Sequence, residues 1–245
     1  MTVPTLLAIV EGASEVTDDG AVELLLAAVR RAAPELRVVP ALVDPHQPEL
    51  ARVLERELAS GEPVVAVPVM LSPGAHLHRD LETELLADDG RDAVLAPALG
   101  SDDTVIELLA SRLLHSGLGA DDVVVMAAAG SSDHHAVRDS VDVGRRLAHV
   151  LERYVTVGFL SAAVPRLEAA VDTMRRLHPG SRVALSTYLL SAGRFAESVA
   201  ELGGDVVAGP LLMPGRRPPQ PLVDLVLSRY HEGAAELTGV RHPLQ

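Results

Sequence analysis

The sequence predicts an α/β protein built from two homologous, doubly wound parallel-sheet domains. Two observations predict the class: continuous apolar runs of strand length, and intervening segments whose apolar residues recur three and four positions apart. A third predicts the duplication, because the whole pattern returns at an offset of about 118 residues. With 245 residues, 48% apolar and 22% charged, the chain has enough apolar side chains for a substantial core.

The first half is expected to contain, in order, a strand within 5–14, a helix around 24–29, a strand within 39–48, a helix around 50–58, a strand over 64–70 and a helix over 107–113. Gly12 marks the turn after the first strand, and Pro48 stands at the first turn of a helix. The run Val64–Met70 has no polar alternation, which is typical of a parallel strand covered on both faces.

The second half repeats these elements in the same order. The matching segments are Val123–Ser132, Val157–Pro165, Ser186–Phe195 and Asp224–Tyr230, and Gly130 falls on Gly12. We therefore expect one domain at 1–115, a second at 123–245, and a linker at 116–122, where two Gly and two Asp residues fall between the halves.

Composition excludes several classes of protein. The chain has no Cys, so it has neither disulfides nor Cys-ligated metal. All its basic charge is Arg, which removes the P-loop lysine, and the net charge of −13 argues against nucleic acid and anionic membrane surfaces. No apolar run has the roughly 18 to 20 residues needed to span a bilayer, and no signal peptide precedes the first strand, so we expect a cytoplasmic protein.

Polar residues follow three strands of the first half. In parallel sheets, ligands bind outside the carboxyl ends of the strands. The first half carries Glu11, Asp44 and His76 there, whereas the second carries Ala129, Ser161 and Phe195. Two carboxylates and an imidazole suit a divalent metal such as Fe²⁺, Co²⁺, Ni²⁺ or Zn²⁺. The sequence thus predicts one chemically competent half and one that has lost its site.

These residues also resemble a known family, the sirohydrochlorin chelatases of the CbiX/SirB type, in their two-repeat form. The most specific motif is Leu71-Ser72-Pro73-Gly74-Ala75-His76 with Asp80. The family's second strand bears an acidic residue four positions before a Pro, and in this chain Asp44 lies four positions before Pro48. The family's first strand ends in His-Gly-Ser-Arg-Asp, whereas this chain has Glu11-Gly12-Ala13-Ser14-Glu15.

The resemblance implies insertion of a divalent metal, Fe²⁺ or Co²⁺, into sirohydrochlorin, in sirohaem or cobalamin biosynthesis, with no organic cofactor. It makes His76 the principal metal ligand and base, with Glu11 in place of the family's first His. Asp44 would orient His76 or relay protons, and His78 is a further candidate ligand. Substrate would contact the remaining candidates, Gly12, Ala13, Ser72, Pro73, Gly74, Ala75 and Arg79. The two halves are expected to act as a pseudo-dimer within a monomer.

Other interpretations of these residues stay open. His76 could pack against the sheet, Glu11 could cap a helix, and Asp44 could serve a local turn. His78 could be a solvated helical residue. Neither Gly turn has a dinucleotide or P-loop pattern, so a nucleotide enzyme is not favoured. Besides the chelatase, the chain could be a tetrapyrrole- or metal-binding relative without turnover, or an enzyme for another macrocycle.

Overall fold

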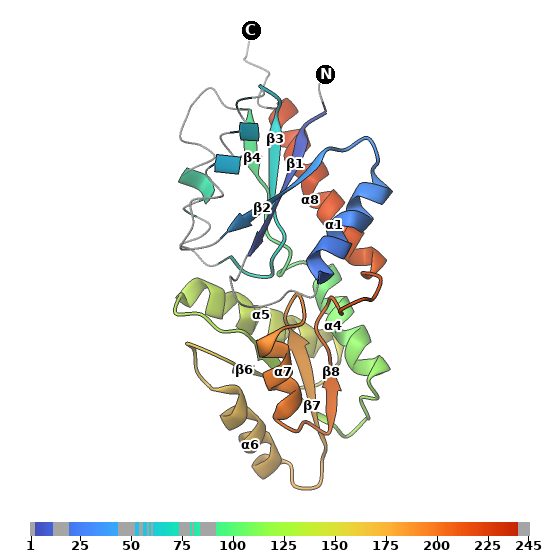
Figure 1. The fold of residues 1–245 in the computed structure, drawn as a ribbon. Coiled ribbons are helices and arrows are strands. Elements are labelled where there is room, and N and C mark those ends of the chain that lie inside the picture. Colours follow the sequence, from blue (N-terminus) through green and yellow to red (C-terminus); the bar gives the residue numbers. More distant parts are fainter. Residues whose placement is uncertain are drawn as a thin grey trace. The chain divides into compact units, whose positions relative to one another are not determined.

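The computed structural model describes residues 3–11, 20–43, 52–53, 56–57, 59, 61–73, 79, 81–83 and 92–239. Within them the strands form two four-stranded sheets in which every pairing is parallel (Figure 1). The first sheet contains β1 (Thr5–Glu11), β2 (Val38–Val43), β3 (Val64–Pro68) and β4 (Ala93–Leu95). The second contains β5 (Val123–Ala128), β6 (Val155–Phe159), β7 (Val183–Tyr188) and β8 (Val206–Ala208).

Helices follow strands of both sheets along the chain. They are α1 (Ala21–Ala32), α4 (Asp103–His115), α5 (His134–Val150), α6 (Leu167–Leu177), α7 (Arg194–Glu201) and α8 (Gln220–Gly239). Residues 52–53, 56–57 and 59, and residues 79 and 81–83, are also helical. Every residue of β3 and β7 is buried, and for β3 this confirms the parallel strand covered on both faces that its continuous apolar sequence predicts.

The internal repeat is confirmed in the topology. The strand orders are β2-β1-β3-β4 and β6-β5-β7-β8, so the first strand of each half lies between the second and the third. The registers agree as well: Thr5 pairs with Val64 in the first sheet, as Val123 pairs with Val183 in the second.

One detail of the predicted alignment is wrong. The sequence comparison places Val39 on Val157, but Val39 pairs with Leu7 in the first sheet, and its counterpart in the second sheet is Thr156, which pairs with Val125. The error is one residue. β2 is apolar along its length, so its sequence offers no alternation that would fix the alignment with β6.

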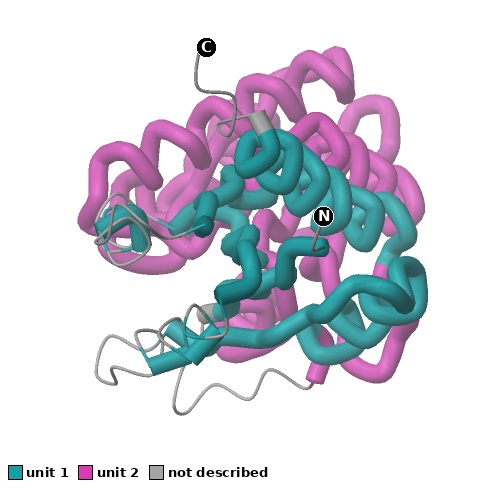
Figure 2. Tube along the Cα trace, turned by 90° about the horizontal axis from the view of Figure 1, so that it is seen from above, with its two compact units in different colours: residues 1–15, 22–99, 219–245 teal, residues 16–21, 100–218 magenta. Residues whose placement is uncertain are grey.

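The chain divides into two compact units (Figure 2). Unit 1 comprises residues 1–15, 22–99 and 219–245, and unit 2 comprises residues 16–21 and 100–218. These units differ from the halves of the repeat, because each half contributes its last helix to the other sheet. The chain passes from unit 1 to unit 2 at residues 99–100, whereas segment 116–122 connects α4 to β5 within unit 2.

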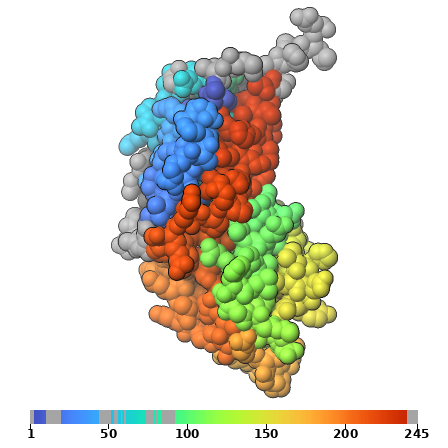
Figure 3. All heavy atoms as spheres, turned by 90° about the vertical axis from the view of Figure 1, so that its right-hand side faces the viewer, coloured from blue at the N-terminus to red at the C-terminus, as the bar shows by residue number. Residues whose placement is uncertain are grey.

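Close packing holds the exchanged helices. In unit 1, α8 packs on β3 and β4, where Gly233 lets the helix approach Val65 and Val94, and the Tyr230 hydroxyl donates to Pro4 O at 2.8 Å. In unit 2, α4 packs on β7, β8 and α5, and Arg112 donates to Leu211 O at 2.7 Å. Figure 3 shows α4, in green, beside α5, in yellow.

Asp122 anchors the connection between α4 and β5. Its carboxylate is buried and accepts hydrogen bonds from Gly119 N at 2.6 Å and from Arg182 Nε and Nη2 at 2.9 and 2.8 Å. Burial alone would raise the pKa of the Asp122 carboxyl, but the hydrogen bonds from Arg182 and Gly119 and the charges of Arg182 and Arg153 outweigh it and lower this pKa. The ionised carboxylate therefore stabilises the folded state.

Across the described part of the chain, no helix combines the length and the apolar composition that crossing a bilayer requires.

Candidate functional site

The residues predicted for the site follow strands that end at the carboxyl edge of the first sheet. Glu11 ends β1 and pairs there with Val43, the last residue of β2. Asp44 follows Val43 in sequence. On the other side of β1, Val69 N donates to Ile9 O at 2.7 Å, so the segment after β3 also leaves beside β1. The segments that carry Glu11, Asp44 and His76 therefore start from three adjacent strands, at the edge where such sheets bind ligands.

Most of the predicted site residues lie outside the described part of the chain. These are Gly12, Ala13, Asp44, Gly74, Ala75, His76 and His78, together with the side chain of Glu11. Their roles stay predictions. What the structure brings together is the backbone that leads into them, namely the ends of β1, β2 and β3.

Ser72, Pro73 and Arg79 are described. Ser72 and Pro73 follow β3 and are half-buried, and the Ser72 hydroxyl oxygen is fully buried and has no hydrogen-bond partner among the described residues. Leaving such a group unpaired typically costs about 1 to 3 kcal/mol. A hydroxyl with unused hydrogen-bonding capacity is common at ligand sites, and this one lies four residues before His76. Arg79 is helical and exposed.

Unit 2 shows how the two halves of the repeat differ at this edge. By the strand registers, Ala129 and Ser161 occupy the positions of Glu11 and Asp44. The backbone N–H and the hydroxyl of Ser161 both donate to Ala129 O, at 2.8 and 2.9 Å. Gly130 has φ +86°, and a Cβ there would lie 2.0 Å from Ser161 O. The segments after β5 and β6 are thus in direct contact, and neither Ala129 nor Ser161 presents a carboxylate.

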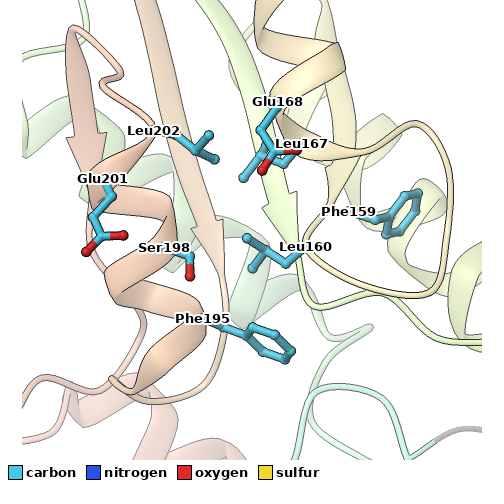
Figure 4. A pocket seen from close by; sticks show the side chains of 8 residues that line it. All are labelled: Phe159, Leu160, Leu167, Glu168, Phe195, Ser198, Glu201 and Leu202. Atoms are coloured by element: carbon cyan, nitrogen blue, oxygen red, sulfur yellow. The ribbon is translucent and has the colours of Figure 1, made fainter.

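Phe195, which the sequence repeat aligns with His76, lines a pocket of unit 2 (Figure 4). The pocket has a volume of about 270 Å³ and lies between α6 and α7. Its lining residues are Phe159, Leu160, Leu167, Glu168, Phe195, Ser198, Glu201 and Leu202. Sequence analysis did not predict this pocket. The one available signal was Phe195 itself, which is one of only two Phe residues in the chain and lies where an exposed helix start would be expected.

Two observations limit the chemistry of unit 2. No cluster of three or more His, Cys, Asp or Glu residues that could hold a metal ion occurs among the described residues. Tyr188, at the end of β7, is buried and donates its hydroxyl to Gly100 O at 3.1 Å. Burial, and to a lesser extent Asp139, raise the pKa of Tyr188 far above its usual value, although Arg146 opposes them. The phenol stays protonated and cannot act as a base.

Comparisons with known proteins agree on one family. The CbiX family model matches residues 5–116 and 123–203. No curated protein matches this chain in sequence.

Two solved structures of SirB resemble the chain along its full length. SirB from Bacillus subtilis with Fe³⁺ has 17% identity and a TM-score of 0.72, covering 96% of this chain and 98% of its own. The sirohydrochlorin chelatase SirB from Bacillus subtilis subspecies spizizenii, in complex with cobalt, has 15% identity and a TM-score of 0.66, covering 96% and 97%.

A third solved structure extends the likeness beyond SirB. It is a multi-domain protein from Deinococcus radiodurans, with structural similarity to chelatases and two additional domains. It has 18% identity and a TM-score of 0.64, and the match covers 94% of this chain and 55% of that one. At these identities the structures support the shared fold, whereas the family model matches both halves of the sequence. The chain belongs to the CbiX family, in its two-repeat form.

Proposed function

We propose that this protein is a sirohydrochlorin chelatase that inserts a divalent metal, Fe²⁺ in the first place and Co²⁺ as the second candidate, in sirohaem or cobalamin biosynthesis. One observation carries the proposal. Three adjacent strands of the first sheet lead into Glu11, Asp44 and the motif that ends in His76, whereas the same strand ends in unit 2 lead into Ala129, Ser161 and Phe195. A structural role for the polar trio would not account for its joint loss in the copy.

Metal insertion requires the protein to supply a metal ligand, a base and a surface that binds the ring. Two pyrrole N–H protons leave the macrocycle as the metal enters, so a group that binds the metal and a group that accepts protons both lower the barrier. His76 serves as metal ligand and base in this proposal, with Glu11 as its partner. Asp44 orients His76 or passes protons to solvent, and His78 is a further ligand.

Substrate contacts follow from the backbone around these residues. Gly12 and Ala13 after β1, and Ser72 to Ala75 after β3, border the ring, because small residues let a flat macrocycle approach the main chain. The unpartnered hydroxyl of Ser72 supports this assignment, since a bound ligand would satisfy it. Arg79 is exposed and is assigned to a peripheral carboxylate of the substrate. No organic cofactor takes part, and one chain supplies one complete site, so a monomer suffices.

The two solved SirB structures bear on the choice of metal. One structure contains Fe³⁺ and the other contains cobalt. Both support a metal site in the fold, and they leave the choice of metal to experiment. The competing function is a tetrapyrrole- or metal-binding protein without turnover, which the change from His to Glu11 favours because a carboxylate replaces one of the family's two imidazoles.

The test is anaerobic metal insertion, followed by the change in absorbance of sirohydrochlorin with Fe²⁺, Co²⁺ or Ni²⁺. Wild type, Glu11→Ala and Glu11→His are compared with the reaction without protein. The chelatase proposal predicts acceleration by wild type and a loss in Glu11→Ala. If wild type does not accelerate insertion and Glu11→His does, the site has lost turnover and the binding function is favoured.

A further inference from the structure

Both phenylalanines of the chain line the pocket of unit 2. Phe159 is the last residue of β6 and is buried, whereas Phe195 is the second residue of α7 and is 45% exposed. The repeat aligns Phe195 with His76, and the residues before it, Leu190-Ser191-Ala192-Gly193, match Leu71-Ser72-Pro73-Gly74. The half that lost the polar trio has therefore kept most of this motif and gained an aromatic side chain at its end.

The floor of the pocket is apolar and continuous with the core of unit 2. Leu167 belongs to that core, and Leu160 and Leu202 pack against it while staying half-buried. Figure 4 shows Leu160 and Phe195 turned toward the opening between α6 and α7. A ligand with an aliphatic body would remove this apolar surface from water, which favours its binding in a pocket of about 270 Å³.

Every charged residue in the pocket lining is acidic. Glu168 lies in the first turn of α6, and Glu201 is the last residue of α7. Both are exposed, and neither carboxylate forms an ion pair or a hydrogen bond with another described residue. The helix dipole places negative charge at the C-terminal end of α7, so Glu201 is unfavourably placed there unless a cation is near. A ligand of this pocket should therefore carry positive charge.

The lining favours an organic cation over the other classes of ligand. A divalent metal needs more ligands than two carboxylates, and no group of three or more His, Cys, Asp or Glu residues that could hold one occurs in the part of the chain that the structure describes. An anion would meet two carboxylates and no cation in the lining. A primary ammonium can pair with a carboxylate, donate to a hydroxyl oxygen and lie near an aromatic ring, and the pocket contains all three.

We propose that the pocket of unit 2 binds a small aliphatic primary amine, with Glu168 as the main partner of its ammonium group and with Leu160 and Phe195 against its carbon chain. In Figure 4 the Glu168 carboxylate lies beside Leu167. Ser198 donates its hydroxyl to Arg194 O at 2.9 Å, which leaves the hydroxyl oxygen to accept a hydrogen bond from the ammonium. All these residues belong to unit 2, and none takes part in the proposed metal insertion, so this site is independent of the proposed function.

The test is a ¹H–¹³C methyl NMR titration of the full chain, which follows the leucine methyl signals of the pocket. The probe is pentan-1-amine, whereas pentan-1-ol and pentanoate have a carbon chain of the same length without the positive charge. The amine should shift the signals of Leu160, Leu167 and Leu202 and bind about three- to tenfold more tightly than the alcohol, and pentanoate should not bind. Equal affinities for the amine and the alcohol would overturn the proposal.

Substitutions locate the ammonium group. Glu168→Gln should weaken the binding of pentan-1-amine about two- to fivefold and leave the affinity for pentan-1-ol unchanged. Phe195→Ala should weaken the binding of both probes, because it removes apolar contact area. Glu197→Gln is the matched control, because Glu197 is an exposed carboxylate of α7 outside the pocket lining, and it should bind the amine as wild type does. An equal loss in Glu197→Gln and Glu168→Gln would show a general effect of charge and refute the site.

Discussion

The contact between the two strand-end segments of unit 2 can be tested by replacing Gly130 with Ala. The Gly130→Ala substitution has two separate effects. An L-residue at φ +86° carries left-handed strain of about 1 to 2 kcal/mol. The new Cβ would also lie 2.0 Å from Ser161 O, a distance that real Cβ atoms essentially never show, so the segment after β6 must move. That movement breaks the hydrogen bonds from the Ser161 backbone N–H and hydroxyl to Ala129 O.

The expected loss of stability in Gly130→Ala is the sum of the backbone strain and the two broken hydrogen bonds. Two hydrogen bonds contribute about 0.5 to 1.5 kcal/mol each, so Gly130→Ala should lower the free energy of unfolding by about 2 to 5 kcal/mol in total. Gly180→Ala is the matched control, because Gly180 has φ +95° and no atom within 4 Å of its added Cβ. Gly180→Ala introduces the same backbone strain without displacing a neighbouring atom, so it should lower the free energy of unfolding by about 1 to 2 kcal/mol.

Urea unfolding followed by far-ultraviolet circular dichroism measures both variants, since the chain has no Trp. Equal losses in Gly130→Ala and Gly180→Ala would refute the close approach of the two segments. The result also bears on the first half of the sequence, where the repeat aligns Gly12, the residue after Glu11, with Gly130.

Further predictions concern Asp122 and two buried serines. Asp122→Asn should lower the urea midpoint near neutral pH, while Asp121→Asn, at an exposed neighbour, should not. Folding lowers the pKa of the Asp122 carboxyl, so the stabilisation by this group is present above its unfolded pKa near 3.8 and is lost as the pH falls toward the lower folded pKa. The difference in stability between wild type and Asp122→Asn should therefore shrink in acid. A difference that persists at pH 2 contradicts this. Ser72→Ala should raise the KM for sirohydrochlorin about three- to tenfold without destabilising the fold. Ser186→Ala is the control, because the Ser186 hydroxyl inside β7 is also buried and unpartnered. This substitution should leave the KM for sirohydrochlorin unchanged and the stability equal or higher. A rise in KM that matches that of Ser72→Ala would count against the role of Ser72.

The duplicated fold could be predicted because its signal is local. Continuous apolar strands such as Val64–Pro68 can exist only where a sheet is covered on both faces, and Gly12 and Gly130 fall at the same place in the repeated sequence. The exchange of α4 and α8 could not be predicted. An apolar helix face shows that the helix is covered, but it does not show which of two similar sheets covers it.

One part of the candidate site could also be predicted from the sequence and confirmed, and another part could not. The pairing of Glu11 with Val43 confirms that the first two strand ends lie side by side, as the expected sheet requires. The roles of His76 and Asp44 stay predictions, because these residues lie outside the described part of the chain.

The central claim is that one half of the repeat catalyses insertion and the other does not. The most direct measurement compares kcat for anaerobic metal insertion at saturating sirohydrochlorin in His76→Ala and in Phe195→Ala, which alters the equivalent position of unit 2. Phe195 is 45% exposed, so its truncation should leave the fold intact. We predict that His76→Ala falls to the rate without protein and that Phe195→Ala keeps the wild-type kcat. Equal kcat values in the two variants would contradict a single functional half.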